Sequence, residues 1–426
     1  MTAPISTEPG PHTSTATQPT PDKISAFAAM RSGPFARVWC GGFVSNVGTW
    51  MQATALSYYT AHLTGSAAWT AVVAAGEFAP TALLGPLGGA LADRYSRKTI
   101  FMSVTAVQGA LAALLTWIMA TSTPGAPVIA LYALANGCTF AIGFPAFQSV
   151  MPELVPPESL SSAIGLSSAS WNFGRVVGPS VTALLFAPLG IAWILGINAL
   201  SFAAVLLALV TIKIPTRQVA AKPIFESILE GFRFVRNDPG LKIMIQSLAW
   251  NTLWLAPFIG LISAMVEKEF GGGQHAVGWL ITAQGTGAVV TGVYFAKAVE
   301  RFSIEKVMVF AMCTCPLTLI VYAVSPNIWI AIPALFLTGL LYFAALSSFS
   351  NIAQLRAPSE FRGRVLSINQ VVLGSVYAIA LGIQGPLGDV FGVRAVTVAA
   401  ALISLVGLAV VRLRNPGVTR AVASAP

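Results

Sequence analysis

Between two long apolar stretches lies Gly89-Ala-Leu-Ala-Asp93-Arg94-Tyr95-Ser96-Arg97-Lys98, here called the hinge. Four of its last six residues are ionised, in a protein in which charged residues make up only 9%. Charged side chains are costly inside a bilayer, so the hinge must lie where water or lipid headgroups solvate it. The hinge therefore marks a membrane surface, and the flanking stretches are expected to lie in hydrocarbon.

Composition assigns the chain to the class of polytopic membrane proteins. Hydrophobic residues make up 55% of the 426 residues, and the mean hydropathy is +0.75. Apolar runs of the roughly 20 residues that a helix needs to cross a bilayer recur along the whole chain. A transmembrane barrel would show short strands of alternating polarity, whereas these runs are long and continuously apolar. The predicted fold class is an all-α membrane protein.

The apolar runs predict twelve transmembrane helices in two pseudo-symmetric bundles of six. They are expected near residues 35–62, 67–92, 99–122, 126–150, 161–188, 190–212, 241–267, 275–297, 306–324, 327–351, 363–388 and 394–412. The segment between the bundles carries apolar residues at helical spacing, which predicts a short amphipathic helix on the membrane surface. The organisation is a disordered arm (1–34), a first bundle (35–212), a central loop (213–240), a second bundle (241–412) and a tail (413–426).

Basic residues determine the expected orientation. If both termini lie in the cytoplasm, nearly all of the 24 Lys and Arg residues fall on cytoplasmic segments, and only Lys268 and Arg394 fall opposite. Membrane proteins retain such residues on the cytoplasmic side, so we expect both termini inside. The net charge of +9 then reflects topology anchors facing anionic lipid, and nucleic acid is not an expected partner.

The two halves of the chain resemble each other weakly but in register. Asp93-Arg94-Tyr95-Ser96 returns as Glu300-Arg301-Phe302-Ser303, in each case just after the second predicted helix of its half. Leu154 and Pro157 likewise find counterparts in Leu355 and Pro358. Two matched six-helix halves are a transporter architecture, with the substrate route between them near the midplane.

The hinge resembles the loop signature of the major facilitator superfamily, Gly-x-Leu-x-Asp-Arg-x-Gly-Arg-Lys, with Ser96 in place of the usual Gly. The matching residues are Gly89, Asp93, Arg94, Arg97 and Lys98. The resemblance implies a gating role, in which Asp93 pairs with a hinge arginine or caps a helix of the other half in one state only. Gly88 and Gly89 would let a neighbouring helix approach closely. The alternative is a cytoplasmic anchor that only fixes topology.

A second match lies in the fifth predicted helix. Its residues Gly165, Gly174, Gly178 and Pro179 follow the Gly-Pro pattern of the antiporter branch, with Thr182 in place of the final Gly. Gly174 and Gly178 share one helix face and permit close packing, while Pro179 removes a backbone donor and bends the helix. The resemblance implies that this face prevents leakage through an exporter; an ordinary packing site is the alternative.

The resemblance covers nearly the whole chain and implies a location in a bacterial inner membrane. It extends to Phe35-Ala36-Arg37-Val38-Trp39 and Phe361-Arg362-Gly363-Arg364-Val365, and it is greatest to the bacterial drug and siderophore exporter branch, whose members are transmembrane secretion effector-like. Many drug antiporters of the superfamily carry a coupling arginine in the fourth helix, whereas residues 126–150 contain none here.

Two charged residues fall near the middle of predicted helices. Inserting Glu77 or Arg175 costs about 2.5 to 3.5 kcal/mol each, so each should face a partner or a wet cavity. In one interpretation Glu77 accepts a transported proton, because burial favours the neutral carboxyl group, and Arg175 tunes it or binds an anionic substrate. In the other, the two form a permanent ion pair between helices. The sequence leaves both open.

Polar and aromatic side chains recur on helices that, by resemblance, line the central cavity. The candidates for substrate contact are Asn46, Trp50, Asn136, Trp250, Asn251, Trp254 and Tyr342. Aromatic walls with a few amides suit an amphiphilic, partly aromatic ligand. Alternatively, the amides join helices and the tryptophans anchor the membrane interface.

The sequence contains no Walker loop and no His-Glu-x-x-His motif, and its three histidines are isolated. We therefore expect no enzyme activity, no cofactor, no metal site and an ion gradient as the energy source. The prediction is a monomeric exporter of small amphiphilic organic compounds, working by proton antiport with alternating access. The alternatives are proton-coupled uptake of a nutrient or vitamin and, from another class, a lipid-moving or sensory membrane protein.

Overall fold

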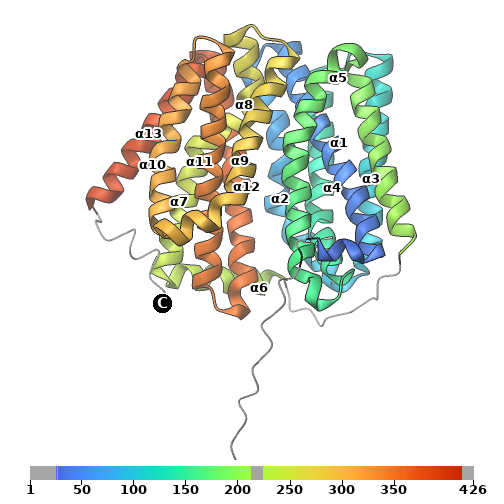
Figure 1. Ribbon diagram of the computed structural model, residues 1–426. Coiled ribbons are helices and arrows are strands. Elements are labelled where there is room, and N and C mark those ends of the chain that lie inside the picture. The colour runs from blue at the N-terminus through green and yellow to red at the C-terminus, as the bar shows by residue number, and fades with distance from the viewer. Residues whose placement is uncertain (1–24, 26, 213–223, 415–426) are drawn as a thin grey trace, which may run out of the picture.

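The computed structural model describes residue 25 and residues 27–212 and 224–414 (Figure 1). Within these residues all secondary structure is helical, which confirms the predicted fold class. The long helices are α1 (Gly33–Thr64), α2 (Ala67–Arg94), α3 (Arg97–Thr121), α4 (Ala126–Glu153), α5 (Leu160–Val210), α7 (Pro239–Leu255), α9 (Gln274–Phe302), α10 (Ile304–Val324), α11 (Ile328–Arg356), α12 (Ser359–Phe391) and α13 (Val393–Arg414). The shorter elements are α6 (Ile224–Asn237), α8 (Pro257–Met265), the 3-10 turns Ala28–Arg31 and Pro157–Ser159, and the π-helical turn Val266–Phe270.

Helix ends coincide with residues that cap the backbone. α1 ends at Gly65, whose φ of 56° lies in the left-handed region that favours glycine. Ser66 then caps α2 by accepting a hydrogen bond from the backbone N–H of Trp69, and Ser96 caps α3 through Thr99 in the same way. The connections on either side of α2 are therefore short, so α1, α2 and α3 follow one another as neighbouring membrane spans.

Within the described residues, ten segments are long and apolar enough to cross a membrane. One of them, Pro157–Val210, is 54 residues long and breaks at Gly190, where φ is 76° and ψ is 171°. A straight helix of that length would far exceed the roughly 30 Å of a bilayer core, so α5 crosses twice, as its two legs in Figure 1 show. α1 has the length of a span but is more polar, with Asn46 and Gln52 inside it. With α1 and both legs of α5, the predicted twelve crossings are present.

Glycine contacts repeat between the two halves. In the first half, a Cβ atom on Gly137 of α4 would lie 2.2 Å from the carbonyl oxygen of Gly76 in α2. In the second half, a Cβ atom on Gly339 of α11 would lie 2.2 Å from the carbonyl oxygen of Gln284 in α9. Backbones approach this closely only where a side chain is missing. The second and fourth helices of each half therefore pack alike, as the internal repeat predicts.

The halves meet along two helix pairs, α2 with α12 and α5 with α9 (Figure 1). A Cβ atom on Gly385 of α12 would lie 2.6 Å from the Cβ atom of Ala71 in α2. A Cβ atom on Gly278 of α9 would lie 2.3 Å from the Cβ atom of Ala183 in α5. Small residues thus line both seams, and each seam pairs the second helix of one half with the fifth of the other.

Some predicted boundaries need correction. The arm predicted to be disordered through residue 34 is helical from Ala28, because Ala29 is buried against the first half and donates its backbone N–H to Ser162 Oγ. The predicted helix near 241–267 is divided into α7, α8 and the π-helical turn, since Pro257 lacks a backbone donor. The central loop contains the expected helix as α6, which crosses the lower end of Figure 1. Residues 1–24, 26, 213–223 and 415–426 lie outside the described residues.

Candidate functional site

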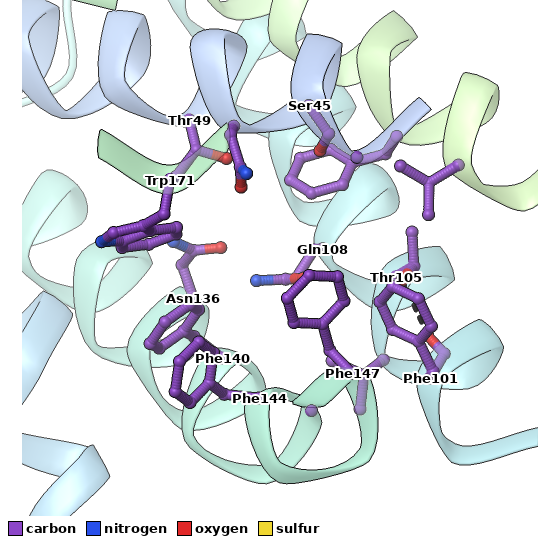
Figure 2. Close-up of a pocket in the computed structure, with 16 residues that line it drawn as sticks. Ser45, Thr49, Phe101, Thr105, Gln108, Asn136, Phe140, Phe144, Phe147 and Trp171 are labelled. Carbon is purple, nitrogen blue, oxygen red and sulfur yellow. Dashed lines mark hydrogen bonds between the residues drawn. The ribbon is translucent and has the colours of Figure 1, made fainter. Parts of the chain in front are cut away.

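A cavity of about 690 Å³, part of it open to its surroundings, lies inside the first half (Figure 2). Its walls come from α1, α3, α4 and both legs of α5. The side chains that give it its chemistry are Ser45, Asn46, Thr49, Phe101, Gln108, Asn136, Phe140, Phe144, Phe147, Trp171 and Phe202. None of its lining residues is ionisable, so this is an uncharged, amphiphilic chamber.

Aromatic rings form one continuous wall of this cavity. Phe140, Phe144 and Phe147 lie on one face of α4, at helical spacing. The ring centres of Phe140 and Phe144 are 5.1 Å apart, and Trp171 stacks on Phe140 at 5.7 Å. Phe101 of α3 extends the wall at 5.4 Å from Phe147. Flat apolar groups can therefore pack against a wall of rings contributed by three helices.

Amide side chains stand between the rings. Figure 2 shows Gln108 and Asn136 pointing into the space, and the side chains of both make no hydrogen bond to other described residues. Asn46 donates to Ser170 Oγ at 2.9 Å, which fixes its orientation. Amides both donate and accept, so the chamber can bind a polar group of either kind.

A smaller cavity, of about 420 Å³ including its open part, continues from the first. Both cavities are lined by Thr49, Asn136, Phe140 and Trp171. Glu77 of α2 lines the smaller one and is the only ionisable residue that lines either of these two cavities. Among the described residues, no hydrogen bond or ion pair is made by the Glu77 carboxyl group. That group is therefore available to whatever enters the chamber.

Arg175 lies at the boundary between the halves and is only 8% exposed. Its guanidinium donates to Oε1 of Gln284 in α9 at 3.0 Å. Its central carbon lies 4.4 Å from the ring centre of Phe343 and 5.3 Å from that of Trp50. No ion pair within 4.0 Å joins it to Glu77 in the described structure, so the permanent ion pair considered from the sequence is not formed here.

Four predicted substrate residues lie in the second half, outside both cavities. Trp250 donates to the backbone carbonyl of Ser404 at 3.4 Å and stands edge to face with Trp254 at 5.7 Å. Asn251 and Tyr342 are each 2% exposed. In this conformation these four residues pack within the second half, whereas Asn46, Trp50 and Asn136 of the predicted set line one or both of these two cavities.

The hinge fastens the ends of the first-half helices to one another. Arg97 forms an ion pair with Glu153 of α4, and Lys98 Nζ donates to the carbonyl oxygen of Ile212 at 2.5 Å. Arg94 is exposed, and the side chain of Asp93 lies outside the described part of the structure. The predicted gating contacts of Asp93 therefore stay a prediction.

The close helix contact beside the hinge belongs to Gly88. A Cβ atom there would lie 2.6 Å from the carbonyl oxygen of Ile142 in α4. A Cβ atom on Gly89 would meet nothing within 4 Å, because this residue is turned away from α4. The expectation that both glycines serve helix packing is wrong for Gly89.

The glycines of the fifth-helix motif pack beneath two cavity residues. A Cβ atom on Gly174 would lie 3.1 Å from the Asn46 Cβ atom, and one on Gly178 would lie 2.6 Å from the Trp50 Cβ atom. This confirms that the two glycines share one face and permit close packing, here against α1. Gly165 has open space around its Cβ position, so it takes no part in the contact.

Polar contacts between the halves gather at one end, here called the far end, opposite the hinge. Asp389 of α12 accepts hydrogen bonds from Ser66 Oγ at 2.6 Å and from the backbone N–H groups of Ala67 and Ala68 at 2.7 and 3.0 Å. Lys268 Nζ also donates to it, at 2.7 Å. Asp389 thus caps the N-terminus of α2 from the other half.

Two further pairs close the far end. His62 lies 3.1 Å from Glu267, and the hydroxyl groups of Ser57 and Ser263 lie 2.7 Å apart. At the hinge end, the ion pairs among the described residues each lie within one half, as for Arg97 with Glu153. Direct polar contacts therefore hold the halves together mainly at the far end.

The aromatic wall was not part of the site predicted from the sequence. A signal for it exists, because Asn136, Phe140, Phe144 and Phe147 recur at intervals of three or four residues on one face of a helix. In an apolar span such a stripe is easily assigned to packing. Asn136 within the stripe is what distinguishes a cavity wall from a packed face.

Twelve crossings in two matched halves, with an amphiphilic cavity in the membrane, define a polytopic membrane transporter. The chain belongs to the transmembrane secretion effector family of the major facilitator superfamily, whose profile matches residues 24–425.

Relatives of this chain are efflux proteins. It is 25% identical over 394 residues to the multidrug efflux pump Tap of Mycobacterium tuberculosis, covering 89% of this chain and 93% of the relative. It is 24% identical over 374 residues to macrolide efflux protein A of Streptococcus pyogenes, covering 84% and 90%. It is also 25% identical over 310 residues to the enterobactin exporter EntS of Escherichia coli, covering 71% and 72%.

Solved structures share the fold. A bacterial homologue of the human lysosomal transporter Spinster, in an inward-facing and unoccupied conformation, matches with a TM-score of 0.69 at 13% identity, covering 93% of this chain and 99% of that one. The peptide transporter POT matches with a TM-score of 0.74 at 11% identity, covering 92% and 96%. At such low identity these matches concern the architecture alone.

Proposed function

We propose that the protein is a secondary transporter that exports small amphiphilic organic compounds in exchange for protons. The observation that carries the proposal is the chamber in the first half, which combines an aromatic wall, free amides and one unpaired carboxyl group. The names of the relatives, which refer to multidrug, macrolide and enterobactin export, support the direction of transport.

The proposal places the hinge end in the cytoplasm of a bacterial cell and the far end outside. The contacts of Asp389, His62 and Ser57 would then hold an outer gate shut while the chamber loads from the cytoplasm. Release requires these contacts to break and the halves to close at the hinge end, which is alternating access. A single chain contains both halves and both gates, so a monomer suffices.

Glu77 is the residue we assign to the proton. A carboxyl group away from bulk water favours its neutral form, and no cation pairs with this one among the described residues. Tyr132 of α4 and Tyr377 of α12 are titratable side chains near it, and neither phenol supplies a positive charge. Glu77 can therefore exchange a proton with the chamber, while Arg175 stays bonded to Gln284.

Proteoliposomes that contain a trapped pH-sensitive dye test the proposal. Candidate dyes, antibiotics and siderophores are added under an imposed proton gradient, to wild type and to Glu77→Gln. The proposal expects a compound that drives proton movement in the wild type but not in the variant. Transport of a compound without any proton movement would disprove coupling. Failure of every compound to move would disprove export.

A further inference from the structure

We propose that the chamber of the first half is a binding site for aromatic cations, with the aromatic body in the larger cavity and the positive centre directed toward Glu77. This choice of ligand deepens the proposed function. Every residue that lines the two cavities lies in α1 to α5, so binding needs no contact from the second half. Ligand binding by the chamber can therefore be measured separately from transport.

Charge is the first argument. Glu77 is the only ionisable residue that lines either cavity, so the chamber presents one negative charge, when ionised, and no positive one. Arg175 is absent from both linings: its guanidinium lies behind the ring of Trp50, which lines the smaller cavity, and is engaged by Gln284 and the Phe343 ring. An anionic ligand would therefore meet no positive side chain in either lining and would face the Glu77 carboxylate, which is unfavourable.

The aromatic wall is the second argument. The faces of aromatic rings attract cations, and they also stack on flat apolar groups. Phe140 and Trp171 line both cavities and stack on each other, so they form a continuous path from the larger chamber to the carboxyl group. A delocalised or quaternary cation keeps contact with ring faces along this path, whereas a compact hydrated cation would lose its water.

The amides are the third argument. Asn136 also lines both cavities, and Gln108 points into the larger one (Figure 2). Their side chains carry no charge, so they can contact polar substituents of the ligand without favouring an anion. Selection between ligands of opposite charge then depends on Glu77 alone.

Tetraphenylphosphonium and tetraphenylborate are suitable probes, because they have nearly the same shape and opposite charge. Binding of each is measured by equilibrium dialysis on the purified full chain in detergent, for wild type and three variants. Glu77→Gln removes the charge, Glu77→Asp keeps it, and Glu300→Gln removes an exposed carboxylate remote from the chamber as the matched control.

The proposal expects the phosphonium ion to bind wild type more tightly than the borate. Glu77→Gln should weaken phosphonium binding by about tenfold or more, which is the effect of losing one buried charge partner, and should narrow the difference between the probes. Glu77→Asp and Glu300→Gln should keep the preference. Phe144→Ala should weaken phosphonium binding without reversing the preference.

Equal binding of the two probes by wild type, or an unchanged phosphonium affinity in Glu77→Gln, would overturn the proposal. Loss of the preference in Glu300→Gln would overturn it as well, because the selectivity would then reflect net charge. These outcomes are separable from those of the transport assay. Glu77-dependent phosphonium binding without proton-coupled transport would contradict the proposed function alone, whereas transport without such binding would contradict only this ligand choice.

Discussion

Replacing Asp389 by alanine should open the far end of the transporter. The Asp389 carboxylate accepts three hydrogen bonds from the other half, from Ser66 and from the backbone of Ala67 and Ala68, and a fourth from Lys268 within its own half. A hydrogen bond to a charged group contributes about 1.5 to 3 kcal/mol. The Asp389 side chain remains 28% exposed, so water replaces much of this hydrogen-bond energy when the three contacts between the halves break. We expect a net shift of about 3 kcal/mol, or roughly 100-fold, toward the open far end.

Chemical labelling of a buried far-end position measures this shift. Ser263 is 1% exposed and bonded to Ser57 of the other half, so a cysteine there reacts only when the far end opens. Ser263→Cys is placed in a background without the four native cysteines, and its reaction with a water-soluble maleimide is timed.

The labelling rate should rise by up to about 100-fold in Asp389→Ala and by less in Asp389→Asn, which keeps hydrogen-bond acceptors but loses the charge. Glu300→Ala, which removes an exposed carboxylate at the opposite end, should leave the rate unchanged. An unchanged rate in Asp389→Ala would refute the account of the far end as a gate.

Three further predictions test other parts of the structure. Gly137→Ala should destabilise the protein by about 1 to 3 kcal/mol in thermal denaturation, because the new Cβ atom would lie 2.2 Å from a backbone oxygen of Gly76. Gly89→Ala should leave the stability unchanged, because a Cβ atom there has open space around it. Equal losses of stability in the two variants would contradict the packing described. Ser303→Gly should stabilise the protein by about 1 kcal/mol in the same assay, since Ser303 adopts a φ of 69° that glycine tolerates; a lower melting temperature would contradict this. Arg175→Lys should weaken the seam between α5 and α9, seen as faster protease cleavage between the halves, because lysine cannot keep both the bond to Gln284 and the stacking on Phe343. Identical cleavage would show that Arg175 does not join the halves.

Much of the fold follows from the sequence because a bilayer restricts the choice. Backbone groups must be paired in hydrocarbon, so long apolar runs can only be helices. Short capped connections such as Gly65-Ser66 then fix where each helix ends. The internal repeat was also readable, since the hinge returns after the second helix of the second half. The break between α7 and α8 could also have been predicted, because Pro257 lacks the backbone donor that a continuous helix needs.

The site was less accessible to sequence reasoning, for two physical reasons. First, an aromatic side chain in an apolar span is equally suited to packing and to a cavity wall. Trp250 packs against the last helix, whereas Trp171 faces the chamber, and their local sequences do not distinguish them. Second, contacts such as that of Asp389 with Ala67 join residues far apart in the chain, so no local pattern reveals them.

The most direct test of the central claim, proton-coupled export through Glu77, uses ethidium, an aromatic cation, and everted membrane vesicles. The vesicle interior is made acidic, the membrane potential is clamped with potassium and valinomycin, and ethidium accumulation is followed by fluorescence. The account predicts accumulation in wild-type vesicles that stops when a protonophore is added and is absent in Glu77→Gln. Accumulation that is equally fast in Glu77→Gln, or that persists after the proton gradient is removed, would contradict it.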